Sequence, residues 1–161
     1  MTINPEFKNK IVKVATNRKA RFEYFVKESL EAGIVLQGIE VKSLRVSKVT
    51  IEDAYAEIVG GELWLKGFHV TPYENAGYET TDPGRKRKLL VRKQELLKLS
   101  KKVDQKGLTL IPLEIYFKGP WAKVTIGLCM GKKLHDKRET LKKKSDLRDV
   151  QRSAKGKFKI T

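Results

Sequence analysis

The chain has 161 residues, 40% of them hydrophobic and 34% charged, enough for one compact core, and no apolar run approaches the length of a membrane-spanning helix. Its single cysteine, Cys129, excludes an intrachain disulfide framework and, with no apolar stretch near the start, fits a cytoplasmic protein. Lys and Arg number 35 against 19 Asp and Glu, and this net charge of +16 favours nucleic acid over a membrane surface as the partner.

The first half of the chain predicts short strands and two short helices. A β-branched run over residues 11–15 predicts a strand, and Asn17 is placed to cap a helix that ends near Tyr24. Residues 25–37 predict an extended segment, and residues 38–46 predict a turn followed by a short helix. Gly60 and Gly61, between two strand-like segments (53–59 and 62–70), indicate a β-hairpin.

The second half predicts a long loop, a helix and another hairpin. Residues 71–87 are polar and contain prolines and glycines, which is typical of a loop, and residues 93–106 have helical periodicity that ends at Gly107. In residues 108–118 and 121–130 apolar side chains recur at every second position, which predicts two strands joined by a turn at Gly119-Pro120. About six strands joined by tight turns predict a mainly β fold with short helices, an OB-like small antiparallel β-barrel.

Composition changes at Gly131. Residues 131–161 hold 12 Lys and Arg against 4 Asp and Glu, so half of the net charge lies in the last fifth of the chain. We therefore expect a globular body over residues 1–130 and a basic C-terminal tail over residues 131–161. Leu147, Val150, Ala154 and Phe158 recur at helical spacing, but they offer too little apolar surface for a helix to fold alone. The tail is therefore expected to order on a polyanion.

The sequence predicts no catalytic residue, metal or cofactor. His69 and His135 lack neighbours at metal-ligand spacing, and no phosphate-binding glycine loop or nucleophile motif occurs. Cys129 lies in an apolar strand, which predicts a buried and unreactive thiol. These features argue against an enzyme.

Four basic clusters are candidate RNA contacts, each with a plainer alternative. Residues 17–21 form either a phosphate site or a solvated helix start. In residues 38–45, Glu40 either accepts from a base edge or ribose hydroxyl, or orients Arg45; an ordinary amphipathic helix is the alternative. Residues 85–88, followed by Arg92 and Lys93, form either an RNA contact or a solvated loop, and the tail cations either bind a polyanion or keep the chain soluble.

Several segments together resemble the SsrA-binding protein (SmpB) family of bacterial ribosome rescue. They are residues 15–20 (ATNRKA), 31–45 (EAGIVLQGIEVKSLR), 82–83 (DP), 87–90 (RKLL) and 131–138 (GKKLHDKR), and the similarity covers nearly the whole chain. The resemblance implies an OB-type barrel that binds the tRNA-like domain of transfer-messenger RNA. It also implies delivery of that RNA to stalled 70S ribosomes, with elongation factor Tu and alanyl-tRNA synthetase acting on the same RNA.

The resemblance also implies roles for individual residues. The expected RNA-binding residues are Asn17, Arg18, Lys19, Arg21, Gly38, Glu40, Lys42, Ser43, Arg45, Lys88, Lys132 and Lys133. The expected ribosome-binding tail is flexible when free and becomes helical in the empty mRNA channel; its residues are His135, Asp136, Lys137, Arg138, Lys142, Lys143 and Lys144. His135 is expected to stack on a decoding-centre base. Gly84, Cys129 and Met130 depart from the family pattern.

Two alternatives to ribosome rescue follow from the sequence. A general OB-fold RNA-binding or ribosome-associated protein would bind with little preference for tRNA-like structure. An enzyme acting on RNA would need a clustered acid–base or metal site, which the sequence does not offer.

Overall fold

A computed structural model describes residues 10–157 of the chain, so the predicted contribution of Phe158 lies outside the described residues. The chain divides into two compact units, residues 1–130 and 131–161. In chain order the elements are β1 (Ile11–Thr16), α1 (Arg18–Glu23), β2 (Tyr24–Ile34), α2 (Gly38–Arg45), β3 (Val49–Thr50), β4 (Tyr55–Val59), β5 (Glu62–Lys66), β6 (His69–Val70), β7 (Arg87–Leu90), α3 (Lys93–Lys106), β8 (Thr109–Lys118), β9 (Trp121–Gly131) and α4 (Leu134–Lys157).

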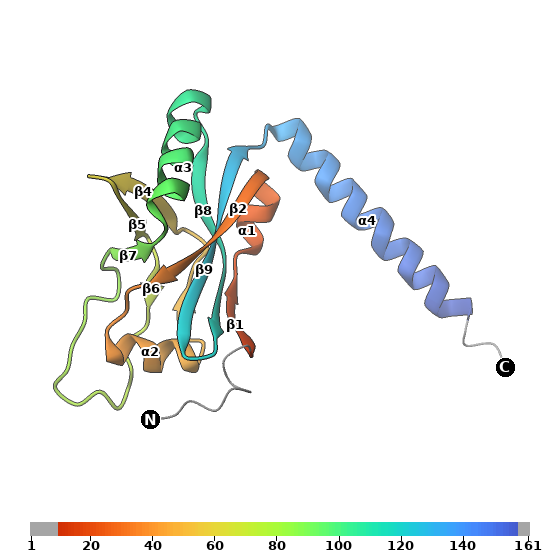
Figure 1. Cartoon of the computed structure of the whole chain (residues 1–161). Helices are drawn as coiled ribbons and strands as arrows, with labels where there is room; N and C mark the ends of the chain where they lie inside the picture. Colours follow the sequence, from red (N-terminus) through yellow and green to blue (C-terminus); the bar gives the residue numbers. More distant parts are fainter. Residues whose placement is uncertain (1–9, 158–161) are drawn as a thin grey trace. The chain divides into compact units, whose positions relative to one another are not determined.

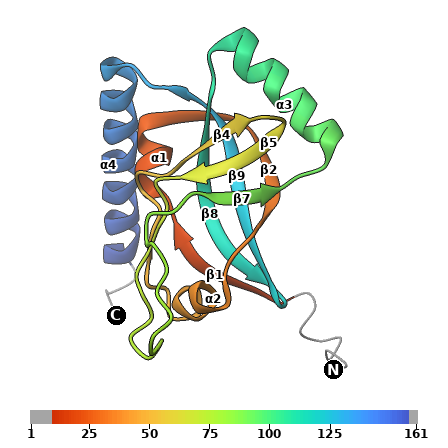
Figure 2. The same ribbon diagram turned by 90° about the vertical axis from the view of Figure 1, so that its left-hand side faces the viewer.

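Seven strands form one sheet that curls back on itself. Their order is β1-β8-β4-β5-β7-β2-β9, and β8 also pairs with β9 (Figures 1 and 2). β8 allows this closure because β9 pairs along its whole length, whereas β1 and β4 share its other edge. The β4–β8 junction is a single residue pair, Ala56 with Leu110, so the ring is only partly closed. The prediction of a mainly β, OB-like barrel with short helices is confirmed.

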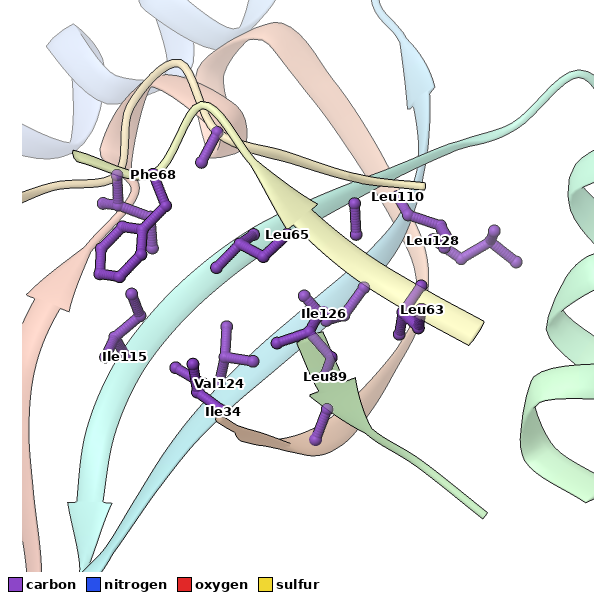
Figure 3. Close-up of a cluster of buried hydrophobic side chains, with 14 of the residues drawn as sticks. Ile34, Leu63, Leu65, Phe68, Leu89, Leu110, Ile115, Val124, Ile126 and Leu128 are labelled. Atoms are coloured by element: carbon purple, nitrogen blue, oxygen red, sulfur yellow. The ribbon is translucent and has the colours of Figure 1, made fainter. Parts of the chain in front are cut away.

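The core lies inside this ring. Alternate residues of β5 and β9 point inward, as their two-residue periodicity requires: Leu63 and Leu65 on one strand, Ile126 and Leu128 on the other. Figure 3 shows these side chains meeting residues of β7 and β8. Full burial of side chains of this size contributes about 1.5–3 kcal/mol each to folding. The described body therefore has a core of its own.

Turn residues take the conformations that the sequence predicts. Gly60 and Gly61 both have positive φ angles, 58° and 73°, as the two central residues of a tight hairpin turn require. Gly107 ends α3 in the left-handed region at φ 59°. The helix over residues 93–106 is confirmed with both its limits.

Two features differ from the sequence prediction. The predicted loop over residues 71–87 included Arg87, and no strand was predicted between that loop and the helix, but Arg87–Leu90 forms β7, which pairs with β2 and β5. The charges of residues 85–88 made this segment look like a loop. In the structure Arg87 faces inward together with Leu89, and its charge is neutralised by Glu40, a residue far away in the sequence. The short strands β3 and β6, which pair with each other, were also not predicted as a pair.

The second unit consists mainly of α4. Its apolar side chains Leu134, Leu141, Leu147 and Val150 are all more than half exposed. This helix of 24 residues therefore buries little apolar surface within its own unit. Isolated helices are marginally stable in water without such packing.

Candidate nucleic-acid interface

Asn17 is a buried anchor for the first basic cluster. It is fully buried, and its Oδ1 accepts a hydrogen bond from the backbone N of Ala20 at 2.9 Å, which confirms the predicted cap of α1. Its Nδ2 donates to the carbonyl oxygens of Pro112 at 3.1 Å and Ile51 at 3.3 Å. The side chain thus ties the start of α1 to β8 and to the segment before β4, but it does not face solvent.

The cations that follow Asn17 lie on the exposed surface of α1. Arg18, Lys19 and Arg21 are all exposed. Lys19 Nζ donates to Asp53 at 2.9 Å, and this hydrogen bond, together with the charge of Asp53, raises the pKa of Lys19. Arg21 Nη2 donates to Glu114 at 3.2 Å. These solvent-exposed ion pairs are weak, so an anionic ligand can compete for the same cations.

Glu40 is buried in the middle of a cationic cluster. Its side chain is 2% exposed and accepts from Arg87 Nη2 at 2.7 Å, from Arg87 Nε at 2.9 Å and from Arg85 Nε at 2.9 Å. It also accepts from the backbone N of Gln37 at 2.9 Å, at the start of α2. Burial by itself would raise the pKa of Glu40, but these hydrogen bonds outweigh burial and hold the pKa below its usual value.

This geometry corrects the expected role of Glu40. A carboxylate at 2% exposure is not available to a base edge or a ribose hydroxyl, and its partners are Arg85 and Arg87, not Arg45. Ser43 is also buried, at 1% exposure. Within α2, the side chains that reach solvent from the predicted set are those of Lys42 and Arg45.

Lys42 and Arg45 each lie over an aromatic ring. Lys42 Nζ is 5.8 Å from the centre of the Tyr73 ring, and the guanidinium of Arg45 is 4.9 Å from the centre of the Phe117 ring. Gly38 opens α2 and is exposed. On β7, half-buried Lys88 donates to Glu62 at 2.7 Å. The structure therefore brings the predicted body residues into three groups, on α1, on α2 and on β7.

The predicted tail residues occupy the start of α4 and its first half. Asp136 Oδ2 accepts from the backbone N of Lys133 at 3.2 Å, so this carboxylate stabilises the helix start. Lys132 Nζ donates to Thr140 Oγ1 at 3.0 Å, and His135 Nε2 lies 3.6 Å from Glu139 Oε1. Lys137 is half-buried, whereas the other predicted cations of α4 are exposed: Arg138, Lys142, Lys143 and Lys144.

The described residues hold no group of three or more side chains able to bind a metal ion. No helix in the described part of the chain is long and apolar enough to cross a membrane. Cys129 is fully buried, which confirms the predicted buried cysteine, and burial raises the pKa of its thiol to about 11. His69 is exposed in β6.

Sequence reasoning missed the buried partner of Glu40, Arg87. Arg87 is fully buried, lies 5.0 Å from the Phe68 ring centre and donates to the carbonyl oxygen of Phe68 at 2.7 Å. Two signals were present in the sequence. Arg87 and Leu89 share one face of a short alternating segment, and Glu40 follows Gln37 by three residues, the spacing of a capping box.

The comparisons with known proteins agree with one another. The family model described as SmpB protein matches residues 14–156. The chain is 54% identical to the SsrA-binding protein of Gloeothece citriformis, over 88% of this chain and 92% of that protein. It is 52% identical to the SsrA-binding protein of Synechocystis sp., over 92% and 97% of the two chains.

The structural comparison points to the same family. A solved chain described as "tmRNA-SmpB: a journey to the center of the bacterial ribosome" superposes with a TM-score of 0.64 at 49% sequence identity. The match covers 79% of this chain and 93% of that chain.

Proposed function

The chain belongs to the SmpB protein family, and we propose that it binds transfer-messenger RNA and delivers it to stalled ribosomes for trans-translation. The description of the solved relative names tmRNA, SmpB and the bacterial ribosome, and the curated relatives are described as SsrA-binding proteins. One observation carries the proposal for this chain. The buried side chain of Asn17 fixes α1, on which Arg18, Lys19 and Arg21 present an exposed cationic surface.

We divide the predicted body residues by their burial. Arg18, Lys19, Arg21, Lys42, Arg45 and Lys88 reach solvent and act as contacts to the tRNA-like domain. The buried residues Asn17, Glu40 and Ser43 position them, and Gly38 starts the helix that carries two of them. Cations fixed by buried anchors recognise the positions of phosphates in a folded RNA, which is how double-stranded RNA is mostly recognised.

The C-terminal residues 131–161 act as the ribosome-directed tail. Lys132 and Lys133 add contacts to RNA, and the exposed residues from His135 to Lys144 enter the empty mRNA channel, where His135 stacks on a base of the decoding centre. The exposed leucines and cations of α4 support this role, because such a helix has little to stabilise it when free and gains packing inside a channel of RNA. We expect α4 to unfold and refold readily in the free protein and to be held as a helix only inside the channel.

The partners follow from this role. Elongation factor Tu and alanyl-tRNA synthetase act on the same RNA, and the chain works in the cytoplasm as a binding protein, not as a catalyst. The second candidate, a general OB-fold RNA-binding protein, rests on the net charge of +16, which by itself gives binding to any RNA.

A reconstituted rescue reaction tests this function. Ribosomes stalled on a message without a stop codon are supplied with transfer-messenger RNA, elongation factor Tu and alanyl-tRNA synthetase, with or without the full chain. We expect recycling of the stalled ribosomes to depend on the chain. Equal recycling without the chain, or none with it, would refute rescue and leave the general RNA-binding protein.

A further inference from the structure

A basic pocket of about 250 Å³ opens between the start of β1, the C-terminal end of α2 and the end of β8. Both ribbon views place α2 near the tip of the β8–β9 hairpin (Figures 1 and 2). Three cations line the pocket, Lys10, Lys13 and Arg45, and no carboxylate does. Its apolar wall includes Val12 and Phe117. The pocket therefore combines an excess of positive charge with an apolar surface.

The cations of this pocket are available to an anion. Within the described residues, neither Lys10 nor Arg45 forms an ion pair, and Arg45 is held over Phe117 at 4.9 Å. Stacking on the ring fixes the guanidinium plane and leaves its N–H groups free to donate at the edge. Lys13 pairs with Glu114 at 3.4 Å, but its side chain is 65% exposed, so this pair is weak.

Ser47 adds a hydroxyl to the pocket wall at a cost in backbone energy. It has φ 56°, and it is the one non-glycine residue with positive φ in the described part of the chain. Glycine adopts this conformation without strain, whereas in a residue with a side chain it raises the conformational energy of the backbone. The Ser47 hydroxyl has no hydrogen-bond partner among the described residues. This conformation ends α2, because Ser47 N donates to the carbonyl oxygen of Leu44 at 2.9 Å and Lys48 N donates to that of Ser43 at 3.1 Å.

We propose that this pocket binds a phosphate group of the RNA backbone, with Lys10, Lys13 and Arg45 as counter-charges and the Ser47 hydroxyl as a hydrogen-bond donor. The inference rests on the proposed function in taking RNA as the partner. A volume of about 250 Å³ exceeds that of a single water molecule, about 30 Å³, several-fold and leaves room for a phosphate and part of its ribose against Val12.

The pocket continues the basic surface of α1. Lys13 Nζ and Arg21 Nη2 both donate to the same oxygen of Glu114, at 3.4 and 3.2 Å, so these two cations lie close together. A strand of RNA that contacts Arg21 of α1 therefore passes close to Lys13 of β1. This extends the predicted contacts to Lys10, Lys13 and Ser47, none of which the sequence motifs singled out.

Binding of the full chain to the tRNA-like domain of transfer-messenger RNA, followed across a series of salt concentrations, tests the pocket. The variants are Arg45→Gln and Ser47→Gly, and the control is Lys101→Gln, which removes one exposed charge from α3. We expect Arg45→Gln to weaken binding about tenfold, since it removes a hydrogen bond to a charged group. The slope of log affinity against log salt should fall by about 0.7–0.9, the share of one phosphate.

Ser47→Gly separates binding from stability. We expect it to raise the temperature of thermal unfolding by removing the strained conformation, and yet to weaken RNA binding about threefold by removing one hydrogen bond. Affinities of both variants equal to that of Lys101→Gln would overturn the pocket. The variants are all compared on the same RNA, so their affinities test only the pocket. The proposed function is tested separately, by the preference of the wild-type chain for the tRNA-like domain over single-stranded RNA of equal length.

Discussion

Glu40 and Arg87 are buried together although 46 residues separate them in the chain. Arg87 Nη2 donates to Glu40 Oε1 at 2.7 Å, and the two side chains are 0% and 2% exposed. Glu40 lies in the first turn of α2, and Arg87 starts β7, so this pair fastens the helix that carries Lys42 and Arg45 to the barrel. Because Arg85 also donates to Glu40, one carboxylate compensates two guanidinium groups.

Replacement of Glu40 by Gln should destabilise the protein. It leaves Arg87 buried without a counter-charge, and breaking a buried ion pair in this way costs about 3–5 kcal/mol. The free energy of unfolding, measured with urea, checks the effect, with Glu79→Gln in the exposed loop as control. We expect RNA affinity to fall as well, because α2 is no longer held. A Glu40→Gln protein as stable as Glu79→Gln would show that the buried pair contributes nothing.

The free energy of unfolding should decrease at low pH as the Glu40 carboxylate becomes protonated. The pKa of Glu40 in the folded protein lies below its ordinary value of 4.5, so its ionised form stabilises the fold. That contribution is complete above about pH 4.5 and is lost as the pH falls through the folded-state pKa. Urea unfolding between pH 3 and 7 should therefore show a smaller acid loss for Glu40→Gln than for the wild type. Parallel curves for the two proteins would contradict this assignment.

Substitutions of Asn17 should separate its two roles. Asn17→Ala removes the cap of α1 and leaves the carbonyl oxygens of Ile51 and Pro112 without their donor, a loss of about 2–3 kcal/mol. Asn17→Asp keeps an acceptor for Ala20 N but removes both donor bonds, so we expect it also to be destabilising.

RNA affinity of the folded Asn17 variants gives the functional part of the test. We expect it to fall more than tenfold, because Arg18, Lys19 and Arg21 lose their fixed position. Asn75→Ala, at an exposed loop position, should change neither quantity. Wild-type affinity of a folded Asn17→Ala protein would mean that the α1 cations need no anchor.

Removal of the tail should separate RNA binding from rescue. A chain that ends at His135 keeps the core, whose residues all lie before Gly131, and keeps Lys132 and Lys133. We expect its affinity for the tRNA-like domain to stay within about threefold of the full chain, and recycling of stalled ribosomes to be abolished. Loss of RNA binding on truncation, with the unfolding transition intact, would refute the division of labour between the two parts.

The elements with strong local signals are predictable from this sequence. The cap at Asn17, the turn at Gly60-Gly61 and the helix end at Gly107 each depend on residues within a few positions, and the structure confirms them. The repeated alternation of apolar residues in residues 108–130 likewise predicts the hairpin that forms β8 and β9.

What the sequence hides is the set of long-range polar contacts. Arg87 belongs to a charged run that indicates a loop, and only the folded barrel brings Glu40 beside it. For the same reason Glu40 was predicted at the surface with Arg45 as an alternative partner, since both lie on one short helix. The pocket around Ser47 is lined by residues of β1, α2 and β8, which lie far apart in the sequence, so no local sequence pattern predicts it.

The most direct test of the account is a competition titration of the wild-type chain at physiological salt. The tRNA-like domain of transfer-messenger RNA competes against single-stranded RNA of equal length, so that the two competitors carry the same number of phosphates. Recognition of a folded RNA by anchored cations predicts a preference of at least a hundredfold, about 2.7 kcal/mol in binding free energy. Near-equal affinities would show that charge alone drives binding and would contradict the proposed role in ribosome rescue.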